Sequence, residues 1–300
     1  MAEIGSRITI AQPSVGARIG KQLWAWRRLP LIPMFILAVF VATGLIAPLI
    51  APHDPERGDI RARMVPPAWM EGGSSEYILG TDHLGRDVLS RVIYGARISL
   101  VVVAVTLGVG LVIGVIAGLL AGWYGGWIDE LMMRIVDIKL AIPTILLALV
   151  LVLALGQSFL IIIAILAIAV WPRFARNTRG EVLQLKNMDY VSLAKVAGAS
   201  TPRILFVHIF PGVVNTLIIL ASLEVGIVIL LESTLSFLGA GVPPPTPAWG
   251  SMVADGRDRL AVAWWISTMP GLAIMLVVLA MNLFGDWLRD KLDPRLRQLE

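Results

Sequence analysis

The sequence predicts an all-α integral membrane protein with six membrane-spanning helices and both chain ends in the cytoplasm. Three observations predict this class. The 300 residues are 57% hydrophobic and only 15% charged, whereas soluble domains carry about 25% charged residues. The apolar residues gather into runs of the length that crosses a bilayer, about 20 residues each. Basic residues collect in two segments that six spans place on one membrane face.

Six apolar segments are the predicted spans. They are Leu31–Ala51, Ile98–Leu120, Ile135–Leu155, Ser158–Pro172, Val213–Leu238 and Trp264–Phe284. The third and fourth are the hardest to separate, because residues 140–172 are almost continuously apolar and roughly twice the length of one span. Gly156-Gln157-Ser158 is the polar, turn-forming break within this run. We therefore expect two spans joined by a tight turn there.

The distribution of charge orients these spans. Residues 1–30 and 173–211 are both rich in lysine and arginine, and the positive-inside bias makes their shared face cytoplasmic. Residues 52–97 and 239–263 have nearly balanced charges and are expected to be outer loops. The predicted organisation is thus a cytoplasmic segment at 1–30 and a six-helix domain over 31–300.

Two flanking segments suggest contact with the membrane surface. Trp24, Trp26, Arg27 and Arg28 precede the first span and suit either an interfacial anchor or an ordinary flank. In the first outer loop, Val88, Leu89, Val92 and Ile93 recur near helical spacing among charged residues. That pattern suits a short helix lying on the membrane surface.

Residue types that carry most enzyme chemistry are missing or scattered. There is no cysteine, and the three histidines His53, His83 and His208 lie far apart in sequence, so we predict no metal site. No G-x-x-x-x-G-K-[ST] phosphate-binding loop is present. No catalytic Ser–His–Asp set or carboxylate pair stands out. Catalysis by this chain alone is not expected.

Two acids lie within the apolar sequence of the fifth predicted span. A charged residue at the bilayer centre costs about 2.5–3.5 kcal/mol on insertion scales, so Glu224 and Glu232 need an explanation. They are eight residues apart, which is about 80° around a helix, and both can face one protein interior. Either they line a polar pathway together with Ser233, or they hydrogen-bond to neighbouring helices and fix packing. We favour packing for Glu224 and leave both roles open for Glu232.

Glycines recur at intervals of four in the second predicted span. Gly110, Gly114, Gly118 and Gly122 form a small-xxx-small ridge, a pattern that lets two helices approach closely. Packing against a helix of this chain or of another subunit is the favoured interpretation.

A polar segment, YVSLAKVAGASTPRILFVHIFP at residues 190–211, separates two strongly apolar runs. It resembles the cytoplasmic loop of ABC importer permeases, E-A-A-x3-G-x9-I-x-L-P, when aligned on Gly198. Ala194 then takes the place of the second alanine and Pro211 that of the last proline. This chain departs from the pattern at four positions, with Ser192 for the glutamate, Leu193 for the first alanine, His208 for the isoleucine and Phe210 for the leucine.

Further segments narrow the resemblance. LGTDHLGRDVLSRVIYGARISL, GGWIDELMMRIVDI, ESTLSFLGAGVPPPTPAWGSMV and NLFGDWLRDKLDPRLRQ resemble the C-type permease subunit of the dipeptide, oligopeptide and nickel group. The matches cover nearly the whole chain after residue 30.

The resemblance implies a type I ABC importer permease bundle in the bacterial cytoplasmic membrane. Its coupling helix, at Tyr190–Arg203, would dock into a groove on a cytoplasmic ATPase, with Gly198 providing the bend and Ala194 the close approach. The residues implied at this docking surface are Tyr190, Ser192, Ala194, Lys195, Gly198, Ala199, Arg203 and Pro211. Because Ser192 replaces the family's glutamate, no contact through that carboxylate is expected.

The resemblance also implies the partners. They are a second permease subunit, two ATPase subunits that bind ATP and magnesium, and an extracytoplasmic substrate-binding protein, with no cofactor or nucleic acid on this chain. Di- or oligopeptides are the first choice of substrate, and nickel or another small solute is the alternative. An autonomous secondary transporter would call for an inverted repeat with paired broken helices, which the sequence does not display, and a membrane scaffold would leave the intramembrane acids without a role.

Overall fold

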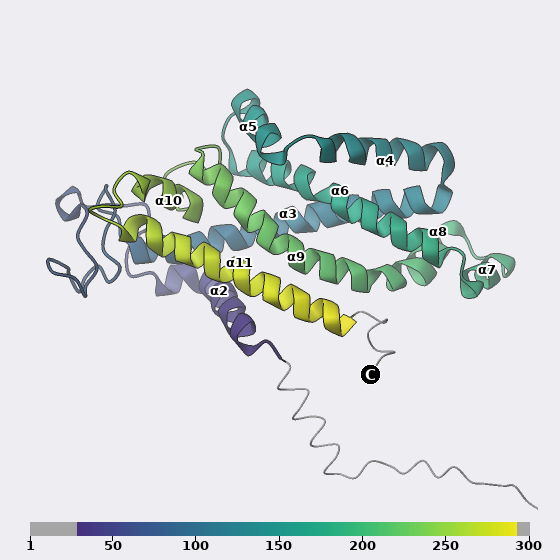
Figure 1. Ribbon diagram of the computed structural model, residues 1–300, viewed down its shortest axis with the longest axis horizontal. Coiled ribbons are helices and arrows are strands. Elements are labelled where there is room, and N and C mark those ends of the chain that lie inside the picture. The colour runs from purple at the N-terminus through teal and green to yellow at the C-terminus, as the bar shows by residue number, and fades with distance from the viewer. Residues whose placement is uncertain (1–28, 293–300) are drawn as a thin grey trace, which may run out of the picture.

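The computed structural model describes residues 29–292, which form an almost wholly helical bundle (Figure 1). Trp24, Trp26, Arg27 and Arg28 lie outside the described residues, so the anchor remains a prediction. The main helices are α2 (Leu31–Ile50), α3 (Val88–Tyr124), α4 (Gly126–Ala141), α5 (Thr144–Leu155), α6 (Phe159–Leu185), α7 (Asp189–Val196), α9 (Phe210–Phe237), α10 (Trp249–Arg257) and α11 (Trp265–Leu292). Three short elements, η1 (Ile60–Ala62), α8 (Thr201–Arg203) and the π-helix η2 (Ile204–Ile209), complete the described chain.

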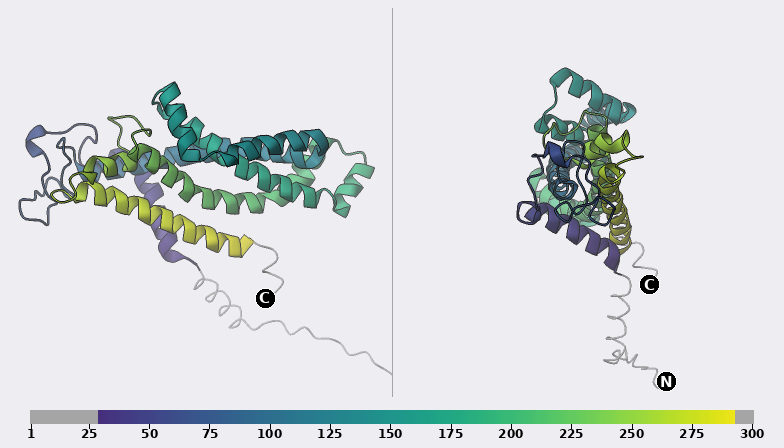
Figure 2. Two further views of the ribbon diagram at one scale, coloured as in Figure 1. Left: turned by 45° about the horizontal axis from the view of Figure 1, so that its top comes forward. Right: turned by 90° about the vertical axis from the view of Figure 1, so that its left-hand side faces the viewer.

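The long helices run along the longest axis of the molecule. Residues 52–87 and the loop that carries α10 lie together at one end, and α7 lies at the other (Figure 1). Figure 2 shows α2 and α5 on opposite sides of the bundle. This arrangement brings the two predicted outer loops together and separates them from the predicted coupling segment.

The described residues contain five helices long and apolar enough to cross a membrane, or six when α4 and α5 count as one bent span. Exposed apolar side chains such as Leu49, Leu153 and Leu160 cover these helices, as expected of surfaces that face lipid. The predicted third span is not straight, because α4 and α5 meet at 88°. Pro143 lacks a backbone N–H and disfavours helical geometry at Ile142, which is extended here.

Helix α3 begins ten residues before the predicted second span, and the surface-helix interpretation of residues 88–93 is wrong. These residues form the first turns of α3. Asp87 caps the helix by accepting hydrogen bonds from the backbone N–H groups of Leu89 and Ser90. The 37 residues of α3 span about 55 Å, well beyond the roughly 30 Å of the hydrocarbon core.

The fourth predicted span ends too early at Pro172, because α6 continues to Leu185. The first third of the predicted 173–211 loop is therefore helix. Ion pairs join this extension to α4: Arg179 contacts Asp129 at 2.5 Å, and Arg176 contacts Asp137.

The glycine ridge of α3 packs on α6 of the same chain, which confirms the packing interpretation. A Cβ atom at Gly110, Gly114, Gly118 or Gly122 would lie 2.4–2.7 Å from atoms of α6. The side chains it would meet first include Val170, Phe174, Thr178 and Val182, which also recur every four residues. Any residue larger than glycine on this glycine ridge would push the two helices apart.

Candidate coupling surface and buried charges

Helix α7 ends in a turn that requires glycine. Gly198 has a φ of +77°, in the left-handed region that residues with a Cβ rarely adopt. The N–H of Ala199 donates to the carbonyl of Ala194 at 3.0 Å, and the N–H of Gly198 donates to the carbonyl of Lys195 at 3.0 Å. These two bonds form the Schellman motif that terminates a helix. The bend predicted at Gly198 is therefore present.

Helix α7 exposes large apolar side chains among its polar ones. Val191 is fully buried and attaches the helix to the bundle, whereas Leu193 is 68% exposed and Val196 is 87% exposed. Phe206 and Val207 of η2 are also more than half exposed. Such side chains at the end of a membrane protein that carries the basic segment 173–211 are typical of a contact surface for another protein.

The other residues predicted for this surface surround α7. The Lys195 ammonium lies 4.6 Å from the centre of the Trp123 ring near the end of α3, a cation–π contact. Tyr190 is 44% exposed, and Ser192 and Arg203 are also exposed, whereas Ala194 and Ala199 are partly buried. Pro211 lies in the first turn of α9, where its missing N–H is tolerated.

Glu224 is buried and paired with a residue that the sequence analysis did not single out. Its Oε1 accepts a hydrogen bond from Nη1 of Arg173 on α6 at 2.7 Å. Its Oε2 is buried with no hydrogen-bond partner among residues 29–292. The pair joins α6 to α9, in agreement with the packing role favoured for Glu224. Arg173 follows Pro172 at the end of an apolar run, a position from which a long cation can reach a buried acid, but the partner was not evident from sequence.

Glu232 has a different environment. Its Oε1 accepts from the Ser236 hydroxyl at 2.7 Å, and the Ser233 hydroxyl lies 3.5 Å from Oε2. Ser233 also contacts α10, because a Cβ at Gly250 would lie 2.1 Å from the Ser233 carbonyl oxygen. Glu224 and Glu232 thus have separate sets of partners, and a pathway role for Glu224, Glu232 and Ser233 remains a prediction.

Lys139 is a third buried charge and was also missed. It is 8% exposed at the end of α4, and its Nζ donates to Thr144 Oγ1 and to the Ala169 carbonyl, both at 3.1 Å. It therefore ties the bend between α4 and α5 to α6.

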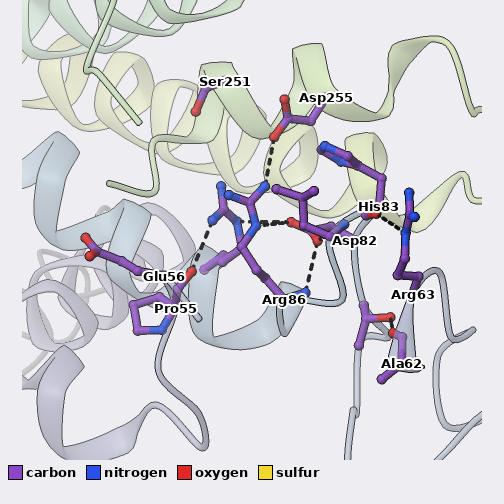
Figure 3. A network of polar contacts seen from close by, with 12 residues as sticks. Pro55, Glu56, Ala62, Arg63, Asp82, His83, Arg86, Ser251 and Asp255 are labelled. Atoms are coloured by element: carbon purple, nitrogen blue, oxygen red, sulfur yellow. Dashed lines mark hydrogen bonds and ion pairs between the residues drawn. The ribbon is translucent and has the colours of Figure 1, made fainter. Parts of the chain in front are cut away.

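The opposite end of the molecule contains a buried ion-pair network (Figure 3). Arg86 donates from Nε to Asp82 at 2.6 Å and from Nη2 to Asp255 of α10 at 3.3 Å. Arg91 of α3 donates to the Pro55 carbonyl at 3.1 Å and lies 3.7 Å from Asp82. These bonds connect the first outer loop, α3 and α10.

His83 lies close to Asp82 and Asp255, and one ligand atom from each falls within 4.8 Å of the others. Burial lowers the pKa of His83, which favours its neutral form. Both carboxylates already bond to Arg86, so a metal ion would have to displace a guanidinium from this group.

The sequence of this chain is similar to those of known membrane transport proteins. The family model described as "Binding-protein-dependent transport system inner membrane component" matches residues 110–298. The dipeptide transport system permease protein DppC of Escherichia coli K12 is 51% identical over 263 residues, covering 88% of this chain and 87% of that protein. The di/tripeptide transport system permease protein DppC of Pseudomonas aeruginosa UCBPP-PA14 is 42% identical over 264 residues, covering 88% and 87%.

A solved structure has the same fold. A chain from inward-facing conformations of the MetNI methionine ABC transporter superposes with a TM-score of 0.55 at 18% identity, covering 68% of this chain and 96% of that one. The long apolar helices, the family match and these relatives all indicate a membrane transport subunit. The chain belongs to the binding-protein-dependent transport system inner membrane components and is an ABC importer permease of the peptide family.

Proposed function

We propose that this chain is one of two permease subunits of an ATP-driven importer, and that it moves di- or oligopeptides across the bacterial cytoplasmic membrane by alternating access. The names of its relatives, a dipeptide and a di/tripeptide permease, support the substrate class. Its partners in this proposal are a second permease subunit, two cytoplasmic ATPase subunits and an extracytoplasmic binding protein.

The observation that carries the proposal is the pair of exposed apolar side chains on α7, Leu193 and Val196, just before the turn at Gly198. The sequence has no phosphate-binding loop, so ATP acts on this chain only through contacts made by another subunit. Leu193 and Val196 give such a subunit apolar area to bury. Because α7 follows α6 after only three residues, movement of α7 is transmitted directly to a long helix of the bundle.

Replacing Gly198 by valine tests the docking assignment. A β-branched residue at a φ of +77° is strongly disfavoured, so the turn after α7 is expected to rearrange. Peptide uptake by the reconstituted transporter should then fall at least roughly tenfold, with membrane insertion unchanged. The matched control is Gly180→Val, because Gly180 lies within α6 and a Cβ there has open space.

Two outcomes would contradict the proposal. Normal coupled uptake with Gly198→Val would remove the docking role of α7. Uptake by this chain in vesicles that lack the ATPase would instead identify an autonomous secondary transporter.

A further inference from the structure

A groove with a volume of about 650 Å³ lies between α6, α9 and α11 near the α7 end of the molecule. Its polar lining consists of Asn177, Glu181, Gln184, Asn215, Thr216 and Arg289, and apolar residues of all three helices complete it. The groove is large enough for a small ligand, since ligand sites commonly measure about 300–1,000 Å³.

The groove contains one acid and one base that are not neutralised by each other. Glu181 accepts a hydrogen bond from the Thr216 hydroxyl at 2.8 Å. Neither Glu181 nor Arg289 forms an ion pair with any residue in the described range 29–292. In contrast, three arginines on α6 (Arg173, Arg176 and Arg179) each contact an acid. Within residues 29–292, Glu181 of α6 thus differs from these neighbouring charges of its own helix, and Arg289 of α11 is the second lining charge without an ion pair.

The chemistry of this lining matches a zwitterion with amide groups. A short peptide carries an ammonium at one end, a carboxylate at the other, and backbone N–H and C=O groups between them. Glu181 suits the ammonium and Arg289 the carboxylate, while asparagine and glutamine side chains both donate and accept hydrogen bonds. We propose that the groove is a transit site that binds the two charged ends of a di- or tripeptide as it leaves the membrane. This inference rests on the proposed peptide-import function.

The test uses the complete transporter with its second permease, ATPases and binding protein, solubilised without nucleotide. The probe is a zwitterionic dipeptide with a photoreactive diazirine on its second side chain, and cross-linked positions are mapped by mass spectrometry. Labelling is expected on α6 and α9 within residues 177–223. Unlabelled dipeptide should compete at least roughly tenfold better than its N-acetylated, C-amidated form, which lacks both charges.

Matched variants separate charge recognition from packing. Glu181→Gln keeps an acceptor for the Thr216 hydroxyl while removing the charge, and Arg289→Gln removes the base. Each should lower labelling about tenfold. Glu130→Gln and Arg134→Gln change exposed charges on α4, outside the groove, and should leave labelling unchanged.

Three results would each overturn the inference. They are cross-links outside residues 177–223, equal competition by the N-acetylated, C-amidated dipeptide, and full labelling of both Glu181→Gln and Arg289→Gln. ATP-coupled peptide uptake by the wild-type transporter is measured alongside. Normal uptake combined with any of these three results rejects the transit site alone, whereas absence of ATP-coupled peptide uptake rejects the proposed function itself.

Discussion

The two ends of this molecule differ in whether their charged side chains are buried. At the end formed by residues 52–87 and α10, charged groups are buried and bonded to one another, with Asp82 2% and Arg86 7% exposed. At the α7 end, apolar groups are exposed, with Val196 at 87%. The buried charges of the first end are paired within one chain, although this end also exposes Ile60 at 75% and Val262 at 74%. The second end exposes large apolar side chains next to basic residues, as expected of a coupling surface.

The largest expected effect comes from breaking the buried network. Arg86→Met leaves Asp82 and Asp255 without their shared guanidinium, and loss of one partner from a buried pair costs about 3–5 kcal/mol. The free energy of unfolding in detergent micelles should fall accordingly. Arg57→Met is the control, because its pair with Asp54 is exposed at both side chains and should contribute about 0–1 kcal/mol. Equal losses in the two variants would show that the outer end is not held by this network.

Substitutions on the surface of α7 are expected to have a smaller effect. They should weaken binding of the ATPase and leave the free energy of unfolding nearly unchanged. Val196→Ser and Leu193→Ser change exposed residues, so the free energy of unfolding should shift by no more than about 0.5 kcal/mol. Retention of the ATPase on the permease, measured by affinity copurification, should fall about tenfold. Ile60→Ser is matched to these variants, because Ile60 is 75% exposed at the opposite end, and it should retain the ATPase fully. Loss of stability in the α7 variants would mean that this surface is already packed within the chain.

The smallest effect concerns the contact between Lys195 and Trp123. A double-mutant cycle with Lys195→Met and Trp123→Leu should give a coupling energy of about 0.5–1 kcal/mol, as is typical of an exposed cation–π pair. The methionine keeps most of the aliphatic stem. A coupling energy of zero would indicate that α7 is attached to the bundle by Val191 and its apolar neighbours alone.

Local sequence signals predicted much of the fold. Apolar length predicted a helix in every span except the bent third one, the glycine spacing predicted a packing ridge, and Gly198 predicted the turn after α7. The break between α4 and α5 was not predicted: Pro143 marks it, but the continuous apolar run around Pro143 favoured a single straight span. The extension of α3 to Val88 was missed, because the charged residues of its first turns suggested a membrane surface. In the structure, buried contacts accommodate them.

The missed pairings depend on residues distant in sequence. Arg86 and Asp255 are 169 residues apart, and Arg173 and Glu224 are 51 apart, so no local pattern links them. The sequence located Glu224 as an anomaly but not its partner. The predicted pathway role of Glu232 and the docking roles around α7 involve surfaces that a single chain does not complete.

The packing of the glycine ridge of α3 against α6 has a mechanical consequence. Two helices whose backbones touch along four successive turns resist bending and sliding far more than either helix does alone. Helix α6, with 27 residues, is about 40 Å long and carries α7 just beyond its end. A displacement applied there would be carried with little loss of amplitude to the far side of the bilayer, so α3 and α6 would act together as a stiff lever arm.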